Sequence, residues 1–233
     1  EVPLGIAPNF LINNKEYVVP MATEEPSVIA AASNGAKTIA ASGGFKAVVH
    51  DKAMIGQIAF HNPLDINTYD DYIQNSSSEL YELAKQAHPS IHRRGGGLES
   101  IFTKYIAEAN RTPFYIVYFK INTLEAMGAN IVNTILEAIK PHLETVFGLE
   151  SVMSIISNDG SDSLVTVTCE IDPVIAGLSE KACELFQIAS DLAVVDPYRT
   201  VTHNKGIMNG VVAVTLASGN DTRAIEAGAH AYA

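Results

Sequence analysis

The apolar and polar positions in the first quarter of the chain form a pattern that predicts strands around one helix. Residues 4–19 hold two short apolar runs around the turn at 13–15, which indicates a β-hairpin. A helix is predicted to begin at Pro26, since proline suits the first helical position, and to end near Ala41 before a pair of glycines. Two further strands follow, at residues 46–50 and 54–61.

The middle of the chain predicts two more helices, separated by strands. Residues 67–88 form an amphipathic helix, whose buried stripe is expected to be Tyr72, Ile73, Leu80, Leu83 and Ala84. The other predicted segments are strands at 98–107, 114–121 and 152–156 and a helix at 123–145. This order is typical of a split β-α-β sandwich, in which both helices cover one face of an antiparallel sheet.

These elements predict an α+β fold with two domains. A small ferredoxin-like domain, built from an antiparallel sheet and two helices, is expected as an insertion at residues 51–157. Residues 1–50 and 158–233 would together form a larger, mixed α/β domain.

The last third of the chain surrounds a polar stretch with apolar segments. A strand is predicted at 163–171 and a long helix at 173–195. Residues 196–210 are rich in polar and charged side chains and include Gly206 and Gly210, which favours a tightly turned loop. The following apolar run, 211–217, fits either a buried strand or a short helix.

This polar stretch carries side chains that suit a binding site, although a solvated surface loop is the simpler alternative. Arg199 offers a planar fork that suits a carboxylate, and Lys205 is a compact point charge. Asp221 follows the apolar run, so Lys205 and Asp221 could meet at one end of that element.

Two predicted helix starts could also be part of a functional site. Glu24 and Glu25 precede Pro26, where they would complement the positive end of the helix or place a proton donor at the mouth of a site. Small residues at 125–130 would let a phosphate approach the free N–H groups of a helix. The chain has neither a GxGxxG motif after a strand nor a Walker-type lysine loop.

Composition narrows the possible partners. The 233 residues are 47% hydrophobic and 18% charged, with a formal net charge of −11, which argues against nucleic acid as a partner. The short basic run at 92–94 suits a single phosphate. Two cysteines without zinc-like spacing predict no disulfide framework, no metal site and a reduced, cytoplasmic setting. The sequence offers no signal peptide and no apolar run of membrane-spanning length, so no membrane association is expected.

Several motifs together resemble one enzyme family along essentially the whole chain. They are VPMATEEPS at 19–27, EAMGAN at 125–130, DPYR at 196–199, THNKGIMNG at 202–210, GND at 219–221 and EAGAHA at 226–231. In this order and at this spacing they resemble the 3-hydroxy-3-methylglutaryl-coenzyme A (HMG-CoA) reductases, specifically the bacterial class II branch.

The resemblance implies an oxidoreductase that reduces a coenzyme A thioester in two steps to mevalonate and free coenzyme A, for isoprenoid biosynthesis. Lys205 would stabilise the negative charge that each hydride addition places on an oxygen. Asp221 would hold and tune Lys205, and Glu25 would donate a proton to the aldehyde oxygen.

The resemblance also implies how the substrate is held and how the enzyme assembles. Arg199 and Ser27 would bind the free carboxylate of the hydroxymethylglutaryl group, and Asn209 would support the Lys205 segment. A homodimer with its active site at the subunit interface is expected.

The inserted domain would hold the nicotinamide cofactor. The expected contacts are Glu125, Met127, Gly128, Ala129, Asn130 and Asn158. The family commonly has Asp at the position of Glu125, so this contact differs in the present chain. No carboxylate occurs in residues 88–94, where NAD-using relatives carry an acid, and a 2′-phosphate could bind to Ser90, Arg93 and Arg94. We therefore predict NADPH as the cofactor.

Two alternatives remain open at this point. The family's catalytic histidine lies in a mobile C-terminal segment, and the chain is expected to be truncated at both ends. It could therefore be a non-catalytic fragment that binds a dinucleotide or acyl-CoA, and His203 and His230 are interpreted as structural. The second alternative is a catabolic, NAD-dependent enzyme that oxidises mevalonate.

Overall fold

The computed structural model describes residues 1–233 and divides them into two compact units. The inserted unit is His50–Leu164, and the flanking unit combines Glu1–Val49 with Val165–Ala233. The span 51–157 predicted for the inserted domain lies within the inserted unit.

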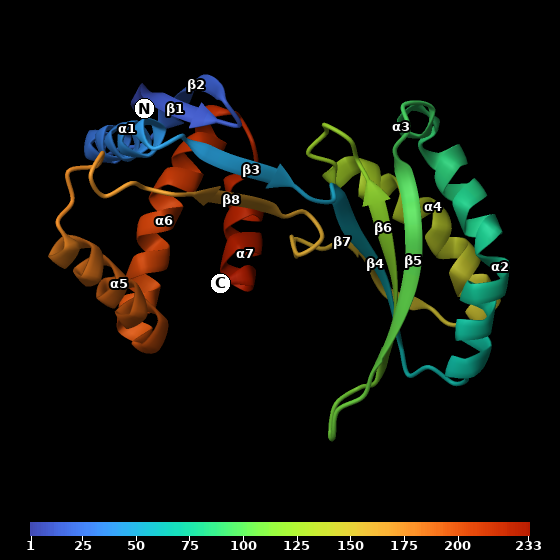
Figure 1. Cartoon of the computed structure of the whole chain (residues 1–233). Helices are drawn as coiled ribbons and strands as arrows, with labels where there is room; N and C mark the ends of the chain where they lie inside the picture. The colour runs from blue at the N-terminus through green and yellow to red at the C-terminus, as the bar shows by residue number, and fades with distance from the viewer. The chain divides into compact units, whose positions relative to one another are not determined.

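The inserted unit is a ferredoxin-like α+β sandwich (Figure 1). Its elements are β4 (Ala53–His61), α2 (Ile66–Ala87), α3 (Pro89–Arg93), β5 (Gly97–Ile106), β6 (Phe114–Asn122), α4 (Ala129–Phe147) and β7 (Ser151–Ile156). The four strands lie in the order β5-β6-β4-β7, and every neighbouring pair is antiparallel. Figure 1 shows α2 and α4 on the same face of this sheet. The predicted fold class is confirmed.

The core of the inserted unit lies between the sheet and these two helices. The predicted stripe of α2 is confirmed: Ile73, Leu80 and Ala84 are buried, and Tyr72 and Leu83 pack at its margin. Side chains from α4 fill the other half of the core, at Val132, Ile135, Leu136, Ile139, Leu143 and Phe147. Each such buried side chain contributes about 1.5–3 kcal/mol to stability.

A carboxylate ties α2 to the sheet. Asp70 on α2 accepts hydrogen bonds from Tyr115 Oη and Thr103 Oγ1, both at 2.7 Å. Burial, together with the Asp70 hydrogen bond, raises the pKa of Tyr115. The phenol therefore remains a donor, and these hydrogen bonds fix the helix against two strands.

The flanking unit contains a second four-stranded sheet with helices (Figure 1). Its strands are β1 (Leu4–Ile12), β2 (Lys15–Ala22), β3 (Phe45–Val49) and β8 (Val165–Cys169), in the order β2-β1-β3-β8. The β1–β2 hairpin turns through Asn13 and Asn14, whose φ values of 50° and 63° suit asparagine. Asn13 also donates to the carbonyl of Ala47 at 3.0 Å, so the hairpin is tied to β3.

The helices of the flanking unit are α1 (Pro26–Ala41), α5 (Glu180–Val195), α6 (Pro197–Ala217) and α7 (Thr222–Tyr232). Helix α1 packs on β1 and α6 packs on β2, around buried Ala7, Met21 and Ala213. Neither α5 nor α7 has a buried residue. Large apolar side chains are exposed, such as Tyr198 at 87% and Phe186 at 79%.

The prediction that residues 196–210 form a loop is wrong, because α6 runs through them without a break. Asp196 caps this helix by accepting from the backbone N–H of Arg199 at 3.0 Å, and Pro197 starts it. Glycine lowers helix stability by only about 1 kcal/mol relative to alanine, so Gly206 and Gly210 do not end it. The apolar run at 211–217 is the last part of the same helix.

Two other predicted helices begin later than expected. Helix α5 begins at Glu180 and not at Pro173, because Gly177 adopts a positive φ of 67° and Ser179 then caps the helix. Helix α4 begins at Ala129 and not at residue 123. The intervening residues form a separate loop that is part of the candidate site. No helix of the structure has both the length and the apolar character that crossing a membrane requires.

Candidate functional site

Residues 123–128, here called the β6–α4 loop, form a compact turn between β6 and α4. The Thr123 side chain donates to the carbonyl of Ala126 at 3.1 Å, and the Ala126 N–H donates to the carbonyl of Thr123 at 3.1 Å. The Leu124 N–H donates to Asn122 Oδ1 at 2.9 Å. Leu124 has a φ of 57°, which is unusual for a leucine and shows how sharply the loop turns.

Gly128 closes the loop and directly precedes α4. Its φ is 94°, and a Cβ atom there would lie 2.6 Å from Thr123 Cγ2 and 2.8 Å from Met54 Sδ. No side chain caps α4, and its first turn contains no acidic residue. The first N–H groups of a helix have no acceptor within the helix, and they carry the positive end of its dipole. This helix start therefore suits an anionic group such as a phosphate.

The other predicted contacts of this segment lie around that helix start. Glu125, Met127 and Asn130 are exposed, and Ala129 is partly buried. Glu125 Oε1 lies 2.9 Å from Lys52 Nζ. The hydrogen bond and the charge of Lys52 lower the pKa of Glu125, which therefore stays ionised.

The predicted phosphate-binding residues Ser90, Arg93 and Arg94 lie on or directly after α3, and all three are exposed. The Ser90 hydroxyl is 3.3 Å from His88 Nδ1, and Arg94 Nε donates to the Ser90 carbonyl at 3.4 Å. The short helix therefore displays two guanidinium groups and a hydroxyl, which are groups that bind phosphate.

The glycines after α3 bring this basic segment against the β6–α4 loop. A Cβ atom at Gly96 would lie 2.6 Å from the carbonyl oxygen of Asn122 and 3.0 Å from Leu124 Cγ. Gly97 also pairs with Asn122 in the sheet. The fold thus brings together two segments that lie about thirty residues apart in the sequence. Each of them is predicted to contact the cofactor.

Asn158 comes shortly after β7, the strand that pairs with β4 on the edge opposite β6. The N–H of Ser157 donates to the carbonyl of Ile55 at 2.7 Å, near the start of β4, and Ala53 in turn pairs with Asn122. The predicted cofactor residues of the inserted unit therefore lie at one end of its sheet. Asn158 itself is exposed.

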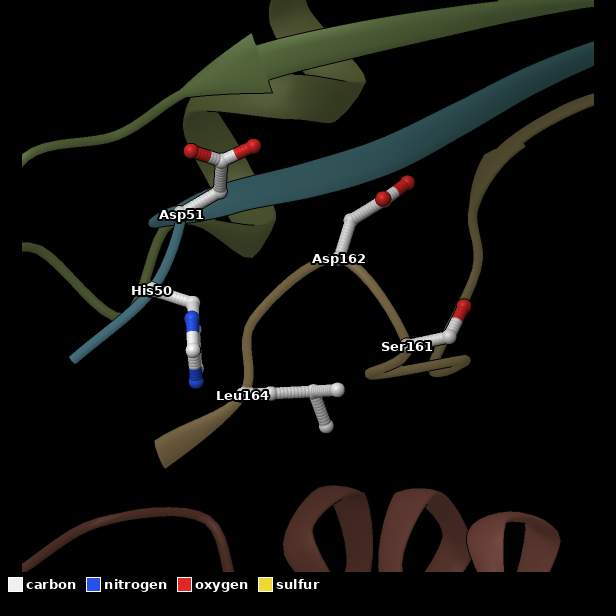
Figure 2. Close-up of a pocket in the computed structure, with 5 residues that line it drawn as sticks. All are labelled: His50, Asp51, Ser161, Asp162 and Leu164. Atoms are coloured by element: carbon white, nitrogen blue, oxygen red, sulfur yellow. The ribbon is translucent and has the colours of Figure 1, made fainter. Parts of the chain in front are cut away.

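Two cavities lie in the inserted unit. The larger has a volume of about 260 Å³ and is lined by His50, Asp51, Ser161, Asp162 and Leu164 (Figure 2). Asp51 is also engaged with Lys120 at 2.8 Å, and this contact lowers the pKa of Asp51. None of the predicted site residues lines this cavity.

The smaller cavity, of about 90 Å³, lies between α2, α3 and the start of β5. Its lining includes Tyr81, Lys85, His88 and His92, beside the basic segment. Lys85 and Lys52 were not predicted from the sequence, and only the fold brings Lys52 to Glu125. For Lys85 the available signal was its helical spacing, four residues after Tyr81 and three before His88.

In the flanking unit, Glu25 and Ser27 lie at the start of α1. The Ser27 hydroxyl donates to Glu25 Oε1 at 2.7 Å, and both side chains are exposed. Glu25 occupies the N-cap position, and its own N–H donates to Thr23 Oγ1 at 3.4 Å. A carboxylate and a hydroxyl predicted for catalysis and for substrate binding are thus in direct contact.

The predicted residues after α5 lie on helix α6 and at the start of α7, not on a loop. Lys205 and Asn209 are four residues apart and share one face of α6, whereas Arg199 lies in its first turn. Asp221 caps α7 by accepting from the N–H groups of Arg223 at 3.0 Å and Ala224 at 3.1 Å. Helix α7 packs on α6. Their predicted roles in catalysis remain predictions.

Comparison with known proteins identifies the family. The profile of the family described as "Hydroxymethylglutaryl-coenzyme A reductase" matches residues 1–233. A 3-hydroxy-3-methylglutaryl-coenzyme A reductase of Archaeoglobus fulgidus is 42% identical over 233 residues, which cover all of this chain and 53% of that protein. The chain therefore spans about half the length of this curated relative.

Solved structures give the same result. The Streptococcus pneumoniae HMG-CoA reductase superposes with a TM-score of 0.94 at 45% identity, covering all of this chain and 56% of that one. A class II enzyme from the same organism, solved with bound NADPH in open conformations, gives a TM-score of 0.90 at 46% identity and the same coverage. The profile match over the whole length, the sequence identity and the shared fold agree: the chain belongs to the hydroxymethylglutaryl-coenzyme A reductase family.

Proposed function

We propose that the protein of which this chain is a part is an NADPH-dependent HMG-CoA reductase, which converts HMG-CoA to mevalonate and free coenzyme A. Family membership supports this activity. The observation that carries the cofactor assignment is the close packing of Gly96 against Asn122 and Leu124. It joins a basic segment and an uncapped helix start, which are the two features that a phosphorylated dinucleotide requires.

The inserted unit is proposed to hold the cofactor. The N-terminus of α4 would bind the pyrophosphate, framed by Glu125, Met127, Gly128, Ala129 and Asn130. Gly128 supports this placement, since its positive φ and its close packing against Thr123 and Met54 fix the turn that leads into the uncapped helix start. Asn158 would contribute from the neighbouring strand end.

The 2′-phosphate is assigned to Ser90, Arg93 and Arg94. Arginine binds phosphate through two parallel N–H groups, and its charge does not depend on pH near neutrality. An NAD-specific site would instead place a carboxylate near the adenosine ribose. Residues 88–94 contain none, which favours NADPH over the NAD-dependent, mevalonate-oxidising alternative.

The flanking unit is proposed to bind HMG-CoA and to carry the chemistry. When bound, NADPH supplies one hydride in each of two reduction steps. The Lys205 ammonium would stabilise the negative charge that develops on the substrate oxygen. Asp221 would orient Lys205, and Glu25 would donate a proton to the aldehyde oxygen.

Substrate binding is assigned to three further residues of the flanking unit. Arg199 and Ser27 would hold the free carboxylate of HMG-CoA, through a guanidinium fork and a hydroxyl. Because a hydroxyl has a single hydrogen to donate, Ser27 would exchange its hydrogen bond to Glu25 for one to the substrate carboxylate. Asn209, one turn after Lys205, would support the lysine side chain.

We further propose that the protein is a homodimer whose active site lies at the subunit interface. The exposed apolar side chains of α5 and α6 support this, with Val194, Phe186 and Tyr198 at 80%, 79% and 87% exposure. Patches of this kind mark surfaces that pack against other protein.

Initial rates of the full-length protein test the proposed function. With HMG-CoA as substrate, NADPH should support turnover with a kcat/KM at least tenfold above that for NADH. A clear preference for NADH would favour the mevalonate-oxidising alternative. Cofactor binding without any turnover, also at saturating HMG-CoA, would favour a non-catalytic binding protein.

A further inference from the structure

Lys52 places a positive charge beside the β6–α4 loop. It directly precedes β4, whose first residue, Ala53, pairs with Asn122 at the end of β6. The antiparallel register therefore continues from Asn122 into the loop on one strand and from Ala53 back to Lys52 on the other. The Lys52 ammonium reaches Glu125 Oε1 at 2.9 Å.

The inner and outer parts of this loop are held differently. Thr123 and Gly128 are buried and fix its two ends. Glu125, Ala126 and Met127 project outward and are exposed. The ion pair between Lys52 and Glu125 is thus the side-chain contact that holds the outward part of the loop.

The charge of Glu125 is unfavourable for an anionic ligand unless it is balanced. Its carboxylate lies three residues before the N-cap of α4, close to the helix start that is proposed to bind the pyrophosphate. Like charges repel each other across such distances when water and salt screen them only in part. Lys52 balances the charge of this carboxylate and contacts it at 2.9 Å.

The length of the side chain matters for this contact. Aspartate, the shorter carboxylic acid, has one methylene less than glutamate. Shortening the side chain at 125 would withdraw the carboxylate from a contact that now measures 2.9 Å. The pair therefore depends on the particular residue that this chain carries.

We propose that Lys52 is a positioning residue for cofactor binding, which acts through Glu125 by holding this carboxylate away from the phosphates of the dinucleotide. This inference rests on the proposed function, since it concerns the same cofactor site. Lys52 does not itself contact the cofactor in this arrangement. Its effect on affinity therefore exists only while Glu125 carries its charge.

A double-mutant cycle in the full-length protein tests this dependence. The dissociation constant for NADPH is measured by fluorescence titration for the parent, Lys52→Met, Glu125→Gln and the double variant. We expect Lys52→Met to weaken NADPH binding about three- to tenfold in the parent and less than twofold in the Glu125→Gln background. The effect should shrink as the salt concentration rises.

Two further variants control for folding and for general charge effects. Lys52→Arg keeps the charge and should retain near-parental affinity, which a loss of fold would not allow. Glu108 and Arg111 form a similarly exposed ion pair at 3.3 Å on the β5–β6 hairpin. Arg111→Met removes a cation in the same way and should leave the affinity for NADPH unchanged.

The possible results separate this inference from the proposed function. If Lys52→Met weakens binding equally in both backgrounds, Lys52 contacts the cofactor directly and the inference is overturned. If Lys52→Met leaves the affinity of the parent unchanged, the inference is overturned as well. If the parent protein does not bind NADPH at all, the proposed function itself fails.

Discussion

Gly96 lies so close to Asn122 that a Cβ atom at Gly96 would stand 2.6 Å from the Asn122 carbonyl oxygen. The carbonyl belongs to the last residue of β6, directly before the loop that leads to α4. This contact holds the segment after α3 against the beginning of the β6–α4 loop. The proposed cofactor site therefore requires a glycine at position 96 to keep this geometry.

The Gly96→Ala substitution should disturb this geometry. Because the clash is with backbone, the chain must shift, and we expect a loss of about 1–3 kcal/mol in the free energy of unfolding together with weaker NADPH binding. Denaturant titration and NADPH titration measure the two effects. Gly160→Ala is the matched control, since its Cβ would meet no atom within 4 Å. Equal behaviour of both variants would contradict the packing described here.

Arg94 and Ser90 should determine the preference for the phosphorylated cofactor. We expect Ser90→Ala and Arg94→Ala each to raise the KM for NADPH, Arg94→Ala by about tenfold, while the KM for NADH changes little. Steady-state kinetics with both cofactors makes the comparison. A parallel rise in both KM values would show that the two residues do not bind the 2′-phosphate.

Lys205 should be required for catalysis but not for folding. Its side chain is exposed on α6, so Lys205→Met should leave the circular dichroism spectrum and the unfolding midpoint unchanged. Loss of the cation should reduce kcat by about 10²- to 10³-fold, as removal of one oxyanion-stabilising donor does in other enzymes. A variant with more than a tenth of the parental kcat would contradict the assigned role.

Asp221 combines a capping role with a proposed catalytic role, and two substitutions can separate them. Asp221→Asn keeps an acceptor for the N–H groups of Arg223 and Ala224, so α7 should stay capped while catalysis falls. Asp221→Ala removes both functions and should also cost about 0.5–2 kcal/mol of stability. If Asp221→Asn retains full activity, the residue serves only as a cap.

The continuous helix α6 also makes a testable prediction. Gly206 lies inside α6, where an added Cβ would meet no atom within 4 Å. Gly206→Ala should therefore raise the free energy of unfolding by about 0.5–1 kcal/mol. Gly219 has a positive φ of 68°, so Gly219→Ala should lower it. A loss of stability in Gly206→Ala would favour the turned loop over the helix.

The fold of the inserted unit could be predicted because its apolar positions follow simple periods. Ile73, Leu80 and Ala84 recur at helical spacing, and all three are buried as expected. The split β-α-β arrangement, with both helices on one face of an antiparallel sheet, could be predicted from the order of elements along the chain.

The α6 helix could not be predicted from the same signals. Its first half is exposed, so it lacks a buried stripe, and Gly206 and Gly210 suggested a turn. Its stability instead begins at the cap on Asp196 and at Pro197, and its last turns pack through Ala213. Packing and capping outweighed the local preference of two glycines.

The candidate site, too, could be predicted only in part from the sequence. The motifs around Lys205 and Glu125 could be assigned from family resemblance, because they are contiguous in sequence. The contacts of Gly96 with Asn122 and of Lys52 with Glu125 join residues far apart in the chain. The pattern of a single sequence does not indicate such pairs, and they are seen only in the folded structure.

The stoichiometry of the reaction tests the central claim most directly. The full-length protein is mixed with a limiting amount of HMG-CoA and excess NADPH, and NADPH oxidation is measured together with the release of free coenzyme A thiol. A four-electron reduction consumes two NADPH for each coenzyme A released, with mevalonate as the product. A ratio of one, or thiol release without NADPH oxidation, would contradict the proposed reductase.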